Sequence, residues 1–343
     1  MKMAISGHVK ILLASALVVF STAATAAQSP AQKTKQIIIA EIARNLIFAP
    51  LYVARARGLF AAEGLDVTIR PMWSPEQVLN WYDSGKAQII VQGVETALFI
   101  RQGAAGPKAK IFASLVSTAP MVLISRRQIA PGKFNWAMLR GKTVIGREQG
   151  RSTGYFFERA LRNHGLDPKT DLAYITDISV PDQVAAWKRG VGDFIVAMEP
   201  APQTFAAEGL GYVVASVGRE VGPIDFTVLI ASEEYISENR ETIQKITNAL
   251  LKALRWMETA SRAEIADAVA PSIDVLGPET LRTGIQRYRE LGIWKNAPSV
   301  DQRSVAEVQT MLIESGVMRS RERIAYETLV DPRFVQRARE TIK

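Results

Sequence analysis

The chain has 343 residues, and its 42 lysines and arginines outnumber its 34 aspartates and glutamates to give a formal net charge of +8. It contains no cysteine, which excludes disulfides and thiolate nucleophiles. Of its two histidines, His8 lies in the predicted signal peptide described below, so His164 alone would remain and a multi-histidine metal centre is excluded. The basic residues are scattered and usually have acidic neighbours, a pattern typical of solvated surface rather than of a nucleic-acid-binding stripe. We therefore expect no nucleic-acid partner, no metal and no cofactor.

Residues 1–27 have the order of a secretory signal peptide. Two lysines give a basic start, an apolar run covers 11–20, and small residues lead to Ala26 and Ala27. The apolar run is too short to cross a bilayer, which requires about 20 apolar residues. We expect cleavage after Ala26 or Ala27, export to the periplasm, and a soluble monomer without a lipid anchor.

Beyond a polar tether that ends at Lys35, apolar stretches of strand length alternate with segments of helical period. This alternation predicts an α/β protein. Ser74 to Gln77 has the form of a helix start, with a cap residue, a proline and a glutamine three residues after the cap. The elements predicted in this part are strands over 36–40, 66–70, 88–92, 111–116 and 121–124, and helices over 50–58, 74–84 and 95–101.

A second, similar series begins near Lys133. Its predicted elements are strands over 143–145, 172–175, 194–198, 212–215 and 226–231, and helices over 152–163 and 181–189. The remaining pattern is almost wholly helical, with helices expected over 237–261, 279–291 and 300–315. Two α/β series in a chain of this length predict two domains.

The stretch from Phe48 to Arg70 carries a resemblance to a known family. It reads Pro-Leu-Tyr-Val-Ala at 50–54, Gly-Leu-Phe at 58–60 and Glu-Gly-Leu-Asp-Val at 63–67. This phrase resembles that of the periplasmic solute-binding proteins of nitrate, sulfonate, taurine and thiamine-pyrimidine importers. A second match covers 139–146 and 150–154, and it looks like the strand and loop that open the second lobe of that family.

The resemblance implies a type II periplasmic binding-protein fold, in which two α/β lobes are joined by two crossover strands and close on a ligand between them. The first lobe would cover 35–125 and 228–343, and the second would cover 126–227. The resemblance further implies a binding component that delivers a small organic solute to a transient partner, an ABC permease, and that is not an enzyme. A permease could distinguish the closed state from the open one.

Ligands of open α/β sheets bind beyond the carboxyl ends of the strands, so residues that follow the predicted strands are the candidate ligand contacts. Asn45 offers a hydrogen-bonding amide, while Phe48 and Tyr52 could flank a planar or apolar ligand. An ordinary loop or core role is the alternative for each of them. The candidates in the first lobe are Arg44, Asn45, Phe48, Tyr52, Trp73, Gln92, Glu95, Thr96, Ser117 and Thr118.

In the second lobe, Gly150 to Tyr155 is expected to open a helix directly after a strand. Small hydroxyl residues at a helix N-terminus suit a carboxylate, sulfonate or phosphate, although Ser152 could equally be a plain helix cap. Glu199 ends a strand, where its carboxylate could accept a hydrogen bond from a ligand amine or hydroxyl. The candidates in this lobe are Arg151, Ser152, Thr153, Tyr155, Glu199 and Asp225.

The acidic candidates would repel a small anion such as nitrate unless Arg44 or Arg151 paired with them. We therefore expect a ligand that combines an acidic or acceptor end with donor groups and a flat ring. The pyrimidine-binding relatives have histidine four residues before the tyrosine that matches Tyr52, where this chain has Phe48, which argues against a thiamine precursor. The alternatives are an enzyme related to thiamine-pyrimidine synthesis, for which the clustered cysteines are missing, and a sensory protein of the same fold. His164 is interpreted as the end of a helix.

Overall fold

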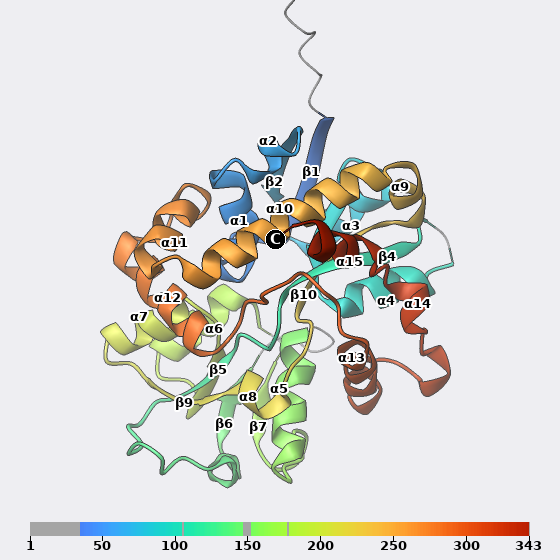
Figure 1. Ribbon diagram of the computed structural model, residues 1–343. Helices are drawn as coiled ribbons and strands as arrows, with labels where there is room; N and C mark the ends of the chain where they lie inside the picture. The colour runs from blue at the N-terminus through green and yellow to red at the C-terminus, as the bar shows by residue number, and fades with distance from the viewer. Residues whose placement is uncertain (1–34, 105, 147–151, 177, 343) are drawn as a thin grey trace, which may run out of the picture. The chain divides into compact units, whose positions relative to one another are not determined.

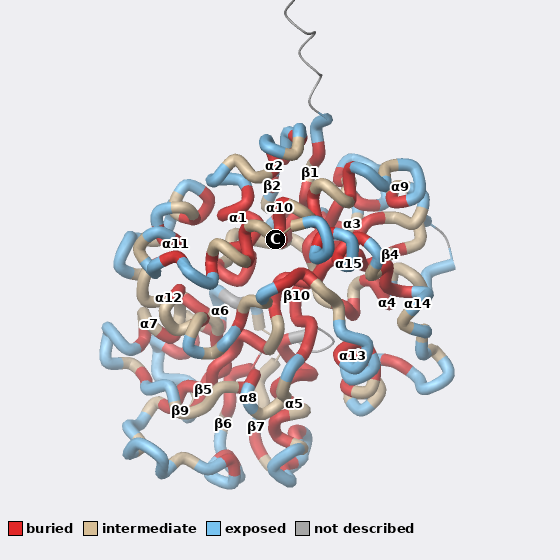
Figure 2. The backbone as a smooth tube through the Cα atoms, viewed as in Figure 1, coloured by how far each residue is buried: buried red, intermediate tan, exposed pale blue. Residues whose placement is uncertain are grey.

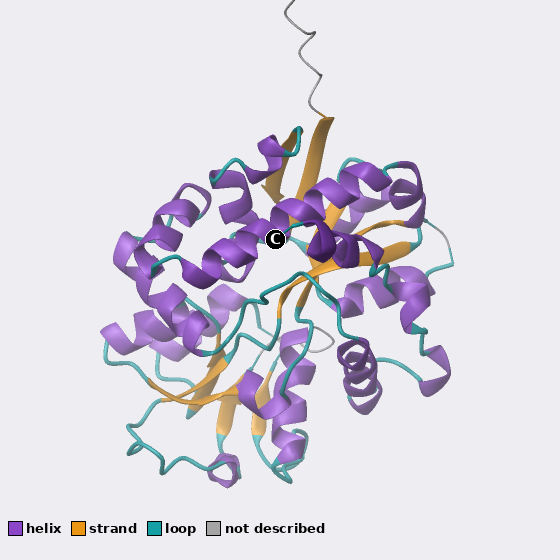
Figure 3. Ribbon diagram, viewed as in Figure 1, coloured by secondary structure: helices purple, strands orange, loops and turns teal. Residues whose placement is uncertain are grey.

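The computed structural model describes residues 35–104, 106–146, 152–176 and 178–342. Its strands form two five-stranded sheets (Figures 1 and 3). The first sheet contains β1 (Lys35–Glu41), β2 (Leu65–Pro71), β3 (Ile89–Gln92), β4 (Ala109–Val116) and β10 (Thr227–Ser232). The second contains β5 (Val122–Ser125), β6 (Thr143–Ile145), β7 (Ala173–Ile175), β8 (Phe194–Ala197) and β9 (Tyr212–Ser216). The α/β class expected from the sequence is confirmed.

Both sheets are mixed and have corresponding strand orders. The first runs β2-β1-β3-β10-β4 and the second runs β7-β6-β8-β5-β9. In each sheet the first three strands in this order are parallel to one another. The fourth strand, β10 or β5, is antiparallel to its neighbours on both sides. The carboxyl ends of the parallel strands therefore lie at one edge of each sheet, which is where α/β proteins place their ligands.

The helices follow the strands in the order that the sequence indicated. Those in the first part of the chain are α1 (Ala49–Ala56), α2 (Leu59–Ala62), α3 (Pro75–Asp83) and α4 (Val94–Gln102). Those between β6 and β10 are α5 (Ser152–Asn163), α6 (Val180–Lys188), α7 (Ala201–Ala207) and α8 (Val217–Val221). The C-terminal ones are α9 (Glu233–Glu238), α10 (Arg240–Thr259), α11 (Arg262–Val269), α12 (Pro278–Glu290), α13 (Gln302–Glu314), α14 (Tyr326–Leu329) and α15 (Arg333–Thr341). None of the helices in the described ranges is both long and apolar enough to cross a membrane.

Local sequence accounts for several helix boundaries. Ser74 caps α3 by accepting a hydrogen bond from the backbone N–H of Gln77 (3.1 Å), with Pro75 at the first helical position, as the sequence predicted. The helix predicted over 237–261 is found as α10, which begins three residues later, because Asn239 leaves helical geometry and its side chain donates to the Tyr235 carbonyl. The short helix α9 before Asn239 was not predicted.

The core follows the strands of both sheets, where most backbone is buried (Figure 2). Along α10, the residues at 243, 246, 250, 254 and 257 are buried. Their spacing of three and four residues places them on one helix face. That face lies against α1, α2 and α15, so the C-terminal helices return to the first sheet.

We call the first sheet with the helices packed on it the first lobe, and the second sheet with its helices the second lobe. The chain passes between them twice, over 117–121 and 217–226. The two passages are hydrogen-bonded side by side, since Thr118 Oγ1 donates to the carbonyls of Gly218 (3.1 Å) and Gly222 (3.3 Å), and Ile224 N donates to Ser117 O (2.8 Å). Strand β5 pairs with β8 and β9, so we propose that the second lobe begins at the first passage rather than after residue 125.

The contact between the two passages leaves no room for a side chain at Gly218. A Cβ atom there would lie 2.4 Å from the Ala119 carbonyl oxygen and 2.6 Å from Thr118 Oγ1. We expect Gly218→Ala to lower the free energy of unfolding by about 1–3 kcal/mol, because backbone must move to accommodate the methyl group. Urea denaturation measures this, and Gly277→Ala is the control, since its Cβ would meet nothing within 4 Å. Equal stability of the two variants would contradict the close approach.

Candidate functional site

A buried carboxylate organises the loop that follows β1. Glu41 ends the strand with its side chain inaccessible to solvent. The Tyr52 hydroxyl donates to its Oε2 (2.7 Å), and the Arg44 guanidinium binds its Oε1. Burial raises the pKa of Glu41 to about 7, although the Tyr52 hydrogen bond and the Arg44 charge act in the opposite direction. Arg44 therefore binds Glu41, and its Nη2 donates to the Ile69 carbonyl (3.0 Å).

Asn45, Phe48 and Tyr52, the candidates in this loop, have identifiable structural partners. The Asn45 side chain accepts a hydrogen bond from Ile47 N (3.0 Å) and so caps the short 3-10 helix Leu46–Phe48. Phe48 and Tyr52 are buried, and the Tyr52 hydroxyl also accepts a hydrogen bond from Asn45 N (3.3 Å). These contacts hold the loop in place, and a role toward ligand for the three side chains stays a prediction.

Trp73 differs from the other aromatic candidates because it is exposed. It lies two residues after the end of β2, 69% of its surface is accessible, and its backbone φ is +59°. A bulky residue in this left-handed region costs about 1–3 kcal/mol. The neighbouring Ser74 cap and Pro75 fix the chain on one side, so the strained turn presents an indole ring to solvent at the carboxyl end of a strand.

The turn from β3 into α4 brings a candidate of the first lobe into contact with one of the second. The Tyr155 hydroxyl on α5 donates to Glu95 Oε2 on α4 (2.9 Å), and both side chains are buried. Burial raises the pKa of Tyr155 well above its usual value, and the Glu95 charge adds to the effect. The Glu95 carboxylate folds over Gly93, where a Cβ would lie 2.1 Å from Oε2. Gln92 and Thr96, beside it, are half-buried.

The anion site expected at the start of α5 falls only partly within the described residues. Arg151 lies outside them, and of Ser152 only its place as the first residue of α5 is described. Thr153 is buried in the first turn of that helix.

Glu199 follows β8 and meets a partner that the sequence did not suggest. The Arg287 guanidinium on α12 binds its Oε1, and the carboxylate is almost fully buried. No described residue donates a hydrogen bond to the other oxygen, Oε2. Burial raises the pKa of Glu199, while the charge of Arg287 acts against that rise. A buried acceptor oxygen without a donor is energetically costly, which marks Glu199 as a place where a ligand donor group would be stabilised.

Ser117, Thr118 and Asp225 lie at the passages between the lobes. Ser117 Oγ donates to the Gly292 carbonyl (2.6 Å). Asp225 has both oxygens occupied, by Lys295 Nζ (2.6 Å) and by the backbone N–H of Asp301 (2.7 Å). Ser117 and Asp225 line a pocket of about 610 Å³, together with the start of α13. Their contacts join the passages to the C-terminal segment.

The residues that sequence reasoning missed are charged partners. Glu41 carried a local signal, since it is the first polar residue after an apolar strand. Arg287, on α12, and Lys295, in the segment between α12 and α13, carried none, because each is far along the chain from the carboxylate that it pairs with.

Two observations bear on catalysis and metal binding. Within the described ranges, no group of three or more histidine or acidic side chains could hold a metal ion. The His164 ring stacks on Trp136, with centroids 5.1 Å apart and planes 10° apart, and lies beside Glu220. These contacts give His164 a packing role at the end of α5.

The two sheets, the double passage between them and the meeting of their carboxyl ends at Glu95 and Tyr155 define a two-lobe periplasmic binding-protein fold. The ligand-binding component of an ABC-type import system from Staphylococcus aureus, solved with zinc bound, has the same fold. It superposes with a TM-score of 0.71 at 14% identity over 89% of this chain and 99% of its own. The fold class expected from the sequence is confirmed.

Sequence comparison identifies the family. A family model described as "NMT1/THI5 like" matches residues 45–260. YtlA of Bacillus subtilis strain 168, named as a candidate binding protein, is 30% identical over 320 residues, which are 93% of this chain and 94% of YtlA. The riboflavin-binding protein RibY of Chloroflexus aurantiacus is 25% identical over 240 residues, which are 68% of this chain and 66% of RibY. The chain belongs to the NMT1/THI5-like family, so the expected resemblance is confirmed.

Proposed function

We propose that the protein is the periplasmic binding component of an ABC importer, which captures a small organic solute between its lobes and delivers it to a permease. The observation that carries the proposal is the contact between Glu95 and Tyr155 (2.9 Å). It brings the turn that follows β3 together with the helix that follows β6, so the carboxyl ends of both sheets lie near each other, which is where such folds bind ligands. The signal-peptide pattern of residues 1–27 and the family membership support export and transport.

The side chains available at these strand ends favour a ligand with a hydrogen-bond donor and a flat ring. Glu199 Oε2 is buried and accepts no hydrogen bond from the described residues, so a ligand amine, hydroxyl or ring N–H would satisfy it. Trp73 offers an exposed indole on which a planar ring could stack. RibY, which is named for a flat heterocycle, supports testing flavins first.

A thermal-shift screen of the mature chain tests the proposal. The panel contains an alkanesulfonate, a dicarboxylate, an aminopyrimidine and riboflavin, because a ligand that binds only the folded state raises its stability. A shift by one class, together with uptake that depends on the gene, supports the transport function. Chemical turnover of the bound compound would favour the enzyme alternative, and binding without any effect on uptake would favour a sensory protein.

Glu199→Gln is expected to weaken binding of the compound that gives the largest shift by about 10- to 100-fold. The change removes the carboxylate charge, and a hydrogen bond to a charged group contributes about 1.5–3 kcal/mol. Isothermal titration calorimetry measures the difference. Glu208→Gln is the matched control, since Glu208 pairs with Lys188 at the exposed end of α7. If both variants bind as tightly as the wild type, Glu199 is not a ligand contact.

A further inference from the structure

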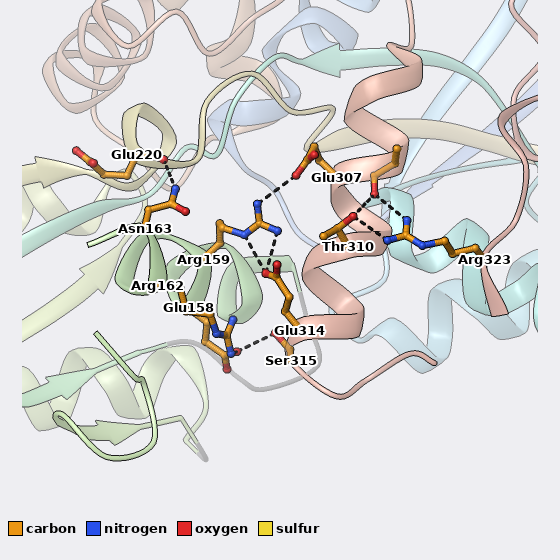
Figure 4. Close-up of polar contacts among 11 residues, drawn as sticks. Glu158, Arg159, Arg162, Asn163, Glu220, Glu307, Thr310, Glu314, Ser315 and Arg323 are labelled. Atoms are coloured by element: carbon orange, nitrogen blue, oxygen red, sulfur yellow. Dashed lines mark hydrogen bonds and ion pairs between the residues drawn. The ribbon is translucent and has the colours of Figure 1, made fainter. Parts of the chain in front are cut away.

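Helix α13 belongs to the first lobe yet reaches the second. It packs against α4 and α14 of the first lobe and against α5 of the second. Arg323 fastens it on the first-lobe side, where Nη2 donates to Thr310 Oγ1 (2.9 Å) and Nη1 donates to the Ala306 carbonyl (3.3 Å). Figure 4 shows α13 between this contact and a second set of charged contacts on α5. The helix is therefore placed to transmit movement between the lobes.

One arginine of α5 binds two glutamates of α13. Arg159 Nη1 lies 3.1 Å from Glu307 Oε2, while Nε and Nη2 lie 3.0 Å and 2.9 Å from Glu314 Oε2 (Figure 4). The glutamates are about two helical turns apart, so they lie on one face of α13 and hold the guanidinium between them. We call these three residues the charged clamp.

A second contact lies beside the charged clamp. Ser315 Oγ, at the end of α13, donates to Glu158 Oε2 (2.8 Å), and Arg162 Nη2 donates to the same oxygen (2.9 Å). Glu158 and Arg159 are neighbours on α5, so both contacts would have to break if the lobes moved apart at this edge. They are polar contacts, which can form and break reversibly in water.

The accessibility of the charged clamp makes it sensitive to salt. The Arg159 side chain is 17% exposed, while those of Glu307 and Glu314 are 52% and 37% exposed. Exposed ion pairs contribute about 0.2–1 kcal/mol each and weaken as ions screen them. The clamp is therefore strong enough to shift an open–closed equilibrium and weak enough not to lock it.

We propose that the charged clamp is an electrostatic latch that sets the closed population of the ligand-free protein and makes closure depend on ionic strength. This rests on the proposed function and deepens it by naming a regulator of closure whose residues are not among the candidate ligand contacts. Any interaction made in the closed state and lost in the open state shifts the equilibrium by its own free energy. Loss of the clamp is expected to lower the ratio of closed to open molecules by roughly 3- to 10-fold.

The absence of cysteine from the chain permits a direct test without any ligand. Glu238→Cys on α9 and Lys169→Cys beyond α5, both at exposed positions, carry spin labels whose separation is measured by pulsed electron paramagnetic resonance. We expect the closed population of the otherwise wild-type protein to fall as sodium chloride rises from about 0.05 M to about 0.5 M. Arg159→Gln is expected to show the lowered closed population at both salt concentrations.

Two further variants keep the test independent of folding. Glu307→Gln with Glu314→Gln removes the same contacts from exposed positions and should reproduce the Arg159→Gln result. Arg323→Gln loosens α13 on the first-lobe side and should keep the salt response. The proposal is overturned if the double glutamine variant keeps the wild-type salt response, or if Arg323→Gln abolishes it equally. Because no solute is present, failure of the latch is distinguishable from failure of the transport function.

Discussion

Replacing Lys295 by methionine is expected to lower the free energy of unfolding by about 3–5 kcal/mol. Asp225 is fully buried, and Lys295 Nζ lies 2.6 Å from its Oδ1 with only 13% of the lysine side chain exposed. Methionine keeps much of the volume and removes the charge, which leaves the aspartate uncompensated between the second passage and α13. Urea denaturation at neutral pH measures the loss.

Lys188→Met provides the control, because its partner Glu208 is at the surface and both side chains are about two-fifths exposed. Its expected cost is below about 1 kcal/mol. Adding Asp225→Asn to Lys295→Met should recover part of the lost stability, since asparagine can still accept the hydrogen bond from Asp301 N. Additive losses in the double variant would show that the two charges do not interact.

Glu41→Gln is expected to change how stability depends on pH. The pKa of Glu41 is about 7 in the folded protein against an ordinary value of 4.5, so the folded state binds the proton more tightly than the unfolded state does. The stability that this provides is fully present below pH 4.5 and is lost as the pH rises through 7. Relative to the glutamine variant, the wild type should lose about 3 kcal/mol across this range.

Chemical denaturation of both proteins between pH 4.5 and 7, and about one unit beyond each limit, measures the difference. Glu241→Gln on the exposed face of α10 is the control. The hydrogen bond from Lys245 lowers the pKa of Glu241, so its effect on stability should have the opposite sign. A pH-independent difference between the wild type and Glu41→Gln would mean that the Glu41 carboxylate is not protonated on burial.

The sequence predicted the elements well where local chemistry decides them. Strand β6 and helix α5 have the bounds that the sequence indicated, because an apolar strand and an amphipathic helix follow each other with clear breaks. Helices α7 and α8 were not predicted. They have seven and five residues, too few for a helical period to emerge, and depend on packing for their stability.

The candidate site likewise contains features that the sequence predicted and features that only the structure shows. The position of Glu199 at the end of β8 was readable from the sequence, because a polar residue follows a buried strand. Its salt bridge to Arg287 was not, since the two are 88 residues apart. Trp73 was predicted beside the Ser74 cap, but its exposure and positive φ are known only from the structure.

The sequence by itself determined the α/β class, the order of most strands along the chain and the family, because these depend on periodicity and on short contiguous phrases. The tertiary structure decided which charges meet. Glu199 with Arg287, Asp225 with Lys295 and Arg159 with the α13 glutamates are pairs that burial and chain crossing create. A charged residue in the sequence carries no record of its distant partner, because the dielectric environment that makes the pair matter exists only once the lobes have folded together.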